Sequence, residues 1–96
     1  MIPKTFQQRN RKVKVMGMSK SLSEELKRHG DFDTEQYVIR LAPAQRELLE
    51  STYFHELAHC ILEGTTKPKL SNNEEFVDSL GCMIHQYMQT KRGEYD

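Results

Sequence analysis

Hydrophobic and polar residues alternate through the first third of the chain, which is the spacing of β-strands. Residues 5–7 and 12–16 alternate in this way and predict two strands that pair as a hairpin turning at residues 9–10. Residues 36–41 predict a third strand. We therefore expect residues 1–42 to consist mainly of strands, arranged in a small antiparallel sheet.

A short helix is predicted between the second and third of these strands. Ser21 and Glu24 have the spacing of a capping box, in which two side chains satisfy backbone N–H groups at the start of a helix. Gly30 is the predicted end of this helix, because glycine readily adopts the conformation in which helices end.

In the rest of the chain the apolar residues recur every three or four positions, as they do in amphipathic helices. One helix is predicted over residues 43–63, with Pro43 at its first position and Gly64 as its stop. Another is predicted over residues 72–90. This order of elements indicates an α+β fold, in which a small sheet packs on two long helices.

The first long helix carries the motif H-E-x-x-H at residues 55–59. His55 and His59 are four residues apart, so they lie on one face with their β-carbons about 5–6 Å from each other. Two imidazoles at this separation are suited to binding one Zn²⁺ ion. Glu56 is turned about 100° further round the helix. It is the candidate catalytic base, and a third protein ligand would complete the site.

The second long helix offers that third ligand. Glu74 and Asp78 are four residues apart and share a face. Glu74 is the candidate zinc ligand, and Asp78 is the candidate acceptor for the far ring nitrogen of a histidine, with His55 the expected partner. A structural interpretation remains open, because Ser71 and Glu74 also have the spacing of a capping box.

These residues together resemble the gluzincins, zinc peptidases in which a glutamate on a second helix follows H-E-x-x-H. The chain is most similar to small ImmA/IrrE-like metallopeptidases, including short versions from phages and mobile elements. Like them, it has Thr52 three residues before the motif. It also has an acidic segment that starts at Glu74 and continues with the family's residue types at Val77, Asp78, Leu80 and Gly81.

The resemblance extends over about residues 30–90. It includes a turn rich in Gly and Asp at residues 30–33 and a strand at residues 37–41. The chain differs in having Leu57-Ala58 where Leu-Gly is common, and no DNA-binding helix-turn-helix accompanies the motif.

A length of 96 residues leaves room for one core, so we expect a single domain over residues 1–96. The resemblance implies that this domain is a minimal zincin-like metallopeptidase. It implies cleavage of a protein or peptide substrate, such as a regulatory repressor. The expected residues are the zinc ligands His55, His59 and Glu74, the catalytic Glu56, and the supporting residues Asp78 and Thr52.

Two further expectations concern the ligand set and the substrate. SprT-like peptidases use a histidine as third ligand, and the candidate would be His85. It lies about 16 Å along its helix from Glu74, so we prefer Glu74. The strand at residues 37–41 is expected to be an edge with which an extended peptide can pair.

Charge adds little to this interpretation. Lys and Arg total 14, as do Asp and Glu, so the balance indicates no particular polyanionic partner. Basic residues gather in the predicted hairpin region, at Lys4, Arg9, Arg11, Lys12 and Lys14. Such a cluster is usually a solvated sheet face, but it leaves a nucleic-acid partner open.

The sequence also bears on location. No apolar run approaches the length of a membrane span, and residues 1–4 lack the core of a signal peptide. We therefore expect a cytoplasmic protein with no membrane partner, whose cysteines, Cys60 and Cys82, are reduced. Cys60 is expected to be a small buried residue rather than a metal ligand.

Two other functions remain open at this point. One is a non-catalytic interaction domain that a metal stabilises, although an intact Glu56 argues against it because a structural site needs no base. The other is a nucleic-acid-associated protease that uses the basic N-terminal strands, which salt-dependent DNA binding would reveal.

Overall fold

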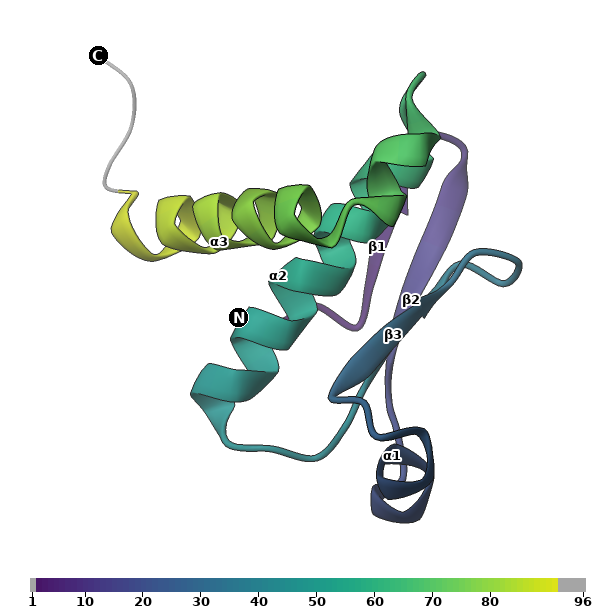
Figure 1. Ribbon diagram of the computed structural model, residues 1–96, viewed down its shortest axis with the longest axis vertical. Helices are drawn as coiled ribbons and strands as arrows, with labels where there is room; N and C mark the ends of the chain where they lie inside the picture. Colours follow the sequence, from purple (N-terminus) through teal and green to yellow (C-terminus); the bar gives the residue numbers. More distant parts are fainter. Residues whose placement is uncertain (1, 92–96) are drawn as a thin grey trace.

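The computed structural model describes residues 2–91, so residues 1 and 92–96 of the expected domain lie outside the described range. Residues 2–91 form an α+β fold in which a four-stranded mixed sheet packs against three helices (Figure 1). The strands are β1 (Thr5–Gln8), β2 (Arg11–Gly17), β3 (Gly30–Asp33) and β4 (Val38–Leu41). The helices are α1 (Lys20–Leu26), α2 (Arg46–Glu63) and α3 (Glu74–Thr90), with a 3-10 turn η1 (Pro68–Asn72) before α3.

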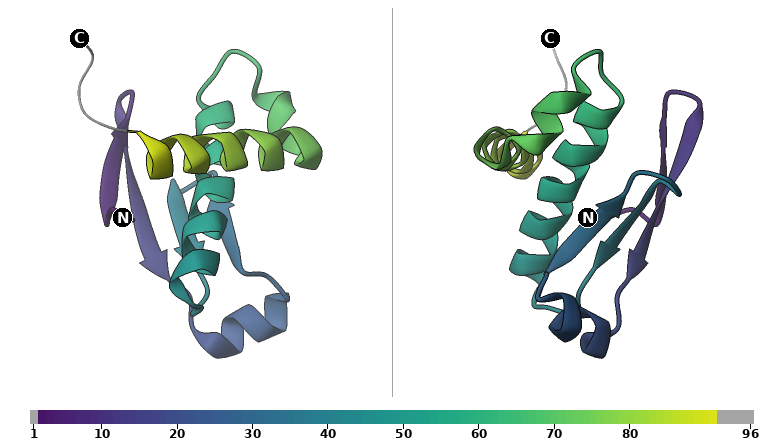
Figure 2. Two further views of the ribbon diagram at one scale, coloured as in Figure 1. Left: turned by 90° about the vertical axis from the view of Figure 1, so that its left-hand side faces the viewer. Right: turned by 45° about the vertical axis from the view of Figure 1, so that its right-hand side comes forward.

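The helices form layers over the sheet. Figure 2 shows α2 lying along one face of the sheet and α3 crossing α2 on the side away from the strands. The core between sheet and α2 is built from Val13, Ile39, Leu41, Tyr53, Phe54 and Cys60. A smaller cluster joins the two long helices through Ala58, Leu62 and Val77. None of the helices described here is long and apolar enough to cross a membrane.

The predicted hairpin is confirmed. Strands β1 and β2 pair antiparallel, with Phe6 opposite Val13, and both side chains face the core cluster. The chain reverses at residues 9–10, where Arg9 has a φ of 54°. This left-handed conformation allows the tight reversal that the alternating pattern predicted.

The expectation of an antiparallel sheet is wrong in one pair of strands. In the order β1-β2-β4-β3, the central strands β2 and β4 run parallel, with Val15 beside Ile39. The chain passes through α1 and β3 before it enters β4, and this connection returns it in the direction of β2. Alternation of apolar residues reports which face is buried and carries no information about strand direction.

The expected turn at residues 30–33 is strand β3, which pairs antiparallel with β4. Only one of its four residues is a large apolar one, so its pattern does not identify a strand. The pairing is stabilised by Asp31, which lies opposite Arg40 and accepts a hydrogen bond of 2.8 Å from its Nε. Because β4 therefore lies between β2 and β3, it is not the edge strand that we expected. The sheet ends in β1 on one side and β3 on the other.

Strand β4 is also shorter than predicted, because residues 36 and 37 belong to the turn before it. Asp33 accepts hydrogen bonds from the backbone N–H groups of Glu35 and Gln36, and Tyr37 has a φ of 55°. The turn of the β3–β4 hairpin is therefore stabilised by local hydrogen bonds to the Asp33 side chain.

The ends of the first helix also differ from the predicted ones. Helix α1 is capped by Ser19, whose Oγ accepts from the N–H of Leu22, rather than by Ser21. It ends at Lys27, which has a φ of 55°, and Gly30 instead starts β3.

The long helices start later than predicted. Helix α2 has Gln45 as its N-cap, so Pro43 precedes the helix instead of occupying its first position, while Gly64 is the C-cap as predicted. Helix α3 has Asn73 as its N-cap, with its side chain accepting from the N–H of Phe76. The capping interpretation of Ser71 is therefore wrong, which frees Ser71 for another contact.

Candidate metal centre

The two long helices bring the three predicted ligands together. His55 and His59 project from α2, and Glu74 is the first residue of α3. Nε2 of His55 lies 3.2 Å from Oε2 of Glu74, and Nε2 of His59 lies 3.4 Å from Oε1. One ligand atom from each residue lies within 4.8 Å of the others. The group could therefore hold one metal ion.

The donor set fits zinc. Imidazole nitrogen and carboxylate oxygen are both common zinc ligands, with bonds of about 2.0–2.2 Å in tetrahedral geometry. Two donors in such a tetrahedron are about 3.3 Å apart. Each histidine Nε2 lies at about that distance from one of the two carboxylate oxygens of Glu74. His55 and His59 are partly buried, while Glu74 is exposed, so the group opens to solvent on the Glu74 side.

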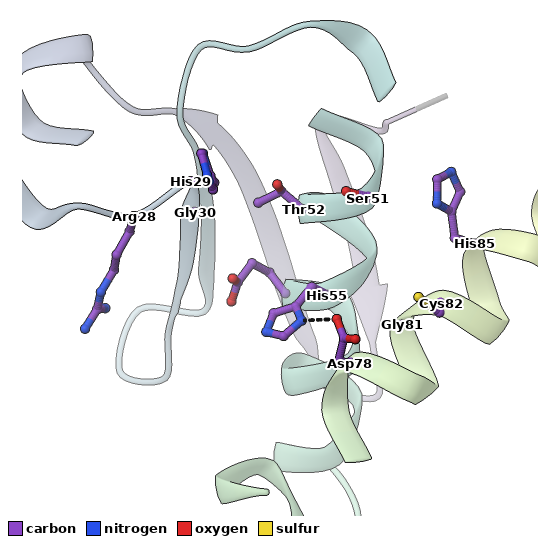
Figure 3. A pocket seen from close by; sticks show the side chains of 11 residues that line it. Arg28, His29, Gly30, Ser51, Thr52, His55, Asp78, Gly81, Cys82 and His85 are labelled. Atoms are coloured by element: carbon purple, nitrogen blue, oxygen red, sulfur yellow. Dashed lines mark ion pairs between the residues drawn. The ribbon is translucent and has the colours of Figure 1, made fainter. Parts of the chain in front are cut away.

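Each histidine also has a polar side chain near its other ring nitrogen, and the contact of His59 is a hydrogen bond. Nδ1 of His59 lies 2.8 Å from Oγ of Ser71 in η1. Nδ1 of His55 lies 3.6 Å from Oδ1 of Asp78, as Figure 3 shows. Both Nε2 atoms face Glu74. Contacts of this kind orient metal-binding histidines and fix the ring tautomer.

Helix α3 approaches α2 closely enough to place Glu74 because residue 81 is a glycine. A Cβ at Gly81 would lie 2.9 Å from the backbone oxygen of Phe54 and 3.0 Å from Cα of His55. Any larger side chain would push α3 away from the histidine-bearing turn of α2. Gly81 therefore sets the distance between the two halves of the candidate metal centre.

Glu56 lies beside this group and is not part of it. Its residue is only 7% exposed, which is unusual for a glutamate that makes no hydrogen bond within residues 2–91. Burial raises the pKa of its carboxyl group to about 7. His55 and Arg28 oppose this shift, while Asp31 and Glu74 add to it. A buried carboxyl with a pKa near neutrality is suited to accepting and releasing protons.

Two hollows meet at Glu56. The strand-side hollow, of about 420 Å³, lies between β3 and the ligands and is lined by residues that include Asp31, Phe32, His59 and Glu74. The helix-side hollow, of about 390 Å³, extends towards α3 and includes Thr52, Cys82 and His85 (Figure 3). Four residues line both hollows, namely Arg28, Gly30, His55 and Glu56.

Thr52 and His85 lie in the helix-side hollow without joining the ligand group. The Cγ2 atom of Thr52 lies 2.7 Å from where a Cβ on Gly30 would be, so Thr52 packs against the start of β3. His85 stacks on Phe54 at 4.7 Å, and its Nε2 lies 3.9 Å from Oε2 of Glu50. His85 thus faces a different part of α2 and is separate from the three residues that could hold the ion.

The expected burial of Cys60 is confirmed. Within residues 2–91 both cysteines are free, and Cys60 is fully buried with its Sγ donating to Oε1 of Gln8 at 3.1 Å. Burial raises the pKa of the Cys60 thiol to about 11. Cys60 therefore belongs to the core that joins β1 to α2.

Two residues of the site are ones that sequence reasoning did not identify. Ser71 was hidden by its capping-box spacing, and the signal that could have exposed it is Asn73, an equally good cap two residues later. Arg28 lies in a loop without any motif, so only the folded chain places it at the hollows.

Comparisons with known proteins add no further constraint: no family model matches the chain, and neither a curated protein nor a solved structure shows significant similarity.

Proposed function

We propose that this chain is a zinc metallopeptidase with a minimal zincin-like fold, of the ImmA/IrrE-like kind that its motifs resemble. The observation that carries the proposal is the position of Glu56. Its buried carboxyl lies next to the His55, His59 and Glu74 group and at the junction of two hollows. A purely structural metal site has no use for a buried, unpaired base at that position.

The residues divide the proposed reaction among them. His55, His59 and Glu74 would hold the ion, whose chemistry when bound is polarisation of a peptide carbonyl and a lowered pKa for water. The Glu56 carboxylate would take a proton from the attacking water and deliver it to the nitrogen of the leaving amine. Because a cation nearby favours the charged form of a carboxyl, metal binding would keep Glu56 ionised at neutral pH.

The sheet supports a protein or peptide as the substrate. Strand β3 is the edge that borders the strand-side hollow, through Gly30, Asp31 and Phe32. Within residues 2–91 no further strand pairs with its outer side, so an extended peptide could pair there and would then pass Glu56 and the ligands. Strand β1, at the other edge of the sheet, carries the start of the basic hairpin and does not line either hollow.

The test separates chemistry from metal binding by changing Glu56 alone. Glu56→Gln should retain zinc and the fold, because Glu56 is not a ligand, and should abolish peptidase activity, because an amide cannot accept the proton. Glu47→Gln, on the exposed first turn of the same helix, is the matched control. Undiminished cleavage by Glu56→Gln would refute the proposal, and a cellular function that survives this change would favour the non-catalytic interaction domain.

A further inference from the structure

Arg28 is held at the entrance to the site by the helix that precedes it. Helix α1 ends at Lys27, and the next residue is fixed through Ser23. The N–H of Arg28 donates to the carbonyl oxygen of Ser23 at 3.3 Å, and Oγ of Ser23 donates to the carbonyl oxygen of Arg28 at 2.9 Å. The backbone from which this side chain projects is therefore anchored on both sides of its Cα.

The side chain of Arg28 reaches the place where the two hollows join. Figure 3 shows it across the helix-side hollow from His55 and Asp78. Among the described residues that line either hollow, Arg28 is the only Lys or Arg. It is exposed, and none of the ion pairs formed within residues 2–91 includes it.

An unpaired guanidinium is notable here because four acidic residues line one or both of the hollows that Arg28 lines. They are Asp31, Glu56, Glu74 and Asp78. Asp31 is neutralised by Arg40, and Glu74 and Asp78 face His55. The N–H groups of the Arg28 guanidinium are thus free to donate to an oxygen of a substrate bound beside Glu56.

We propose that Arg28 binds the carbonyl oxygen of the peptide bond to be cut and stabilises the negative charge that develops there. This inference rests on the proposed peptidase function. As the water oxygen bonds to the carbonyl carbon, its proton passes to Glu56 and the carbonyl electron pair moves onto oxygen. When the C–N bond breaks, that pair re-forms the carbonyl and the proton passes to the amine. Bound substrate would exclude water from around the Arg28 guanidinium. Facing the carbonyl oxygen, the guanidinium would then favour the charged state.

The test uses a tetrahedral anion in place of the charged intermediate. Methylphosphonate is titrated against the cobalt-loaded full-length protein, and its binding is followed through the visible spectrum of the cobalt. We expect the dissociation constant for methylphosphonate to rise at least tenfold in Arg28→Gln and less in Arg28→Lys, which keeps the charge. Arg9→Gln, at the distant β1–β2 turn, removes the same charge and should leave the constant unchanged.

Each outcome decides a different part of the account. Cobalt affinity should be the same in Arg28→Gln and wild type, because Arg28 is not a ligand. Normal cobalt binding with methylphosphonate affinity unaltered by Arg28→Gln would overturn the role of Arg28 alone. The same loss of methylphosphonate binding in metal-free protein, measured by isothermal titration calorimetry because no cobalt spectrum is available there, would also overturn it, by showing an anion site independent of the metal. A wild type that binds no cobalt would overturn the metal centre itself, and this inference with it.

Discussion

At the scale of single residues, both histidines have a polar neighbour at the ring nitrogen that does not face Glu74. Ser71 contacts His59, and Asp78 faces His55. We expect Ser71→Ala and Asp78→Ala each to lower zinc affinity by about 10–100-fold, because a freed imidazole loses its orientation. Asp78→Asn should cost less, since an amide oxygen still accepts a hydrogen bond. Competition with a chromophoric chelator measures these affinities.

The control for both variants is Ser79→Ala, which removes an exposed hydroxyl elsewhere on α3. Ser71→Ala leaves the helix cap intact, because Asn73 supplies it. Zinc affinities equal to that of wild type would show that neither contact orients a ligand, and that Asp78 is an ordinary acid in the first turns of a helix.

The buried Glu56 also leads us to expect that the stability of the metal-free protein depends on pH. Burial raises the pKa of its carboxyl from 4.5 to about 7, so the folded state holds this proton more tightly than the unfolded chain. Below about pH 4.5 both states are protonated and the stabilising contribution is complete. As the pH rises towards 7, the unfolded chain loses its proton first, and the free energy of unfolding should fall by up to about 3 kcal/mol.

Denaturant unfolding measures this contribution of Glu56 to the free energy of unfolding. Wild type and Glu56→Gln are compared across this pH range with a chelator present. Burial lowers the pKa of His59, which acts in the opposite direction, but this contribution is shared by both proteins and largely cancels in their difference. A difference in stability that does not change with pH would mean that the Glu56 carboxyl titrates normally and is not desolvated.

At the scale of elements, the close passage of α3 over α2 controls the geometry of the site. A methyl group at Gly81 would clash with the backbone at Phe54 and His55. We expect Gly81→Ala to lower the free energy of unfolding by roughly 1–3 kcal/mol through overpacking, despite the better helix propensity of alanine. It should also weaken zinc binding, because Glu74 would move with α3.

Gly17→Ala is the matched control, since a Cβ there meets nothing within 4 Å. Thermal or denaturant unfolding, together with the chelator competition, measures both effects. A Gly81→Ala variant as stable as wild type and with the same zinc affinity would show that the helix crossing does not set the ligand spacing.

The elements also show how far sequence reasoning reaches. The shared face of His55 and His59 could be predicted because helix geometry repeats regularly. Glu74 lies on another helix, so it could be proposed only from the H-E-x-x-H motif and its resemblance to the gluzincin pattern. Strand β3 was missed because the Asp31–Arg40 pair, and not an apolar pattern, supports its pairing. The mixed sheet was missed because strand direction depends on the whole connection between strands.

The predictions of where helices begin were wrong for a related reason. Ser19 and Ser21 are both suitable caps by composition, and so are Ser71 and Asn73. The backbone conformation decides which one caps the helix, and tertiary contacts help to set that conformation. The clearest gain from the structure is Ser71, which contacts a histidine because Asn73 takes over the cap.

At the scale of the whole molecule, the two edges of the sheet have different surroundings. Strand β3 borders the strand-side hollow, while the basic β1–β2 hairpin lies at the other edge (Figure 1). Helix α2 connects the two regions. One of its faces packs on the sheet, and the histidines lie to one side of that face. In a chain of this size the core is small, so a metal that links α2 to α3 would also stabilise the fold.

The central claim is that His55, His59 and Glu74 bind one zinc ion, and zinc content measured by atomic spectroscopy tests it most directly. Wild type should contain one zinc per chain, and His59→Ala and Glu74→Ala should lose most of it. Glu75→Ala, which changes the neighbouring exposed glutamate, should retain it. A wild type without zinc, or full zinc content in both His59→Ala and Glu74→Ala, would contradict the account.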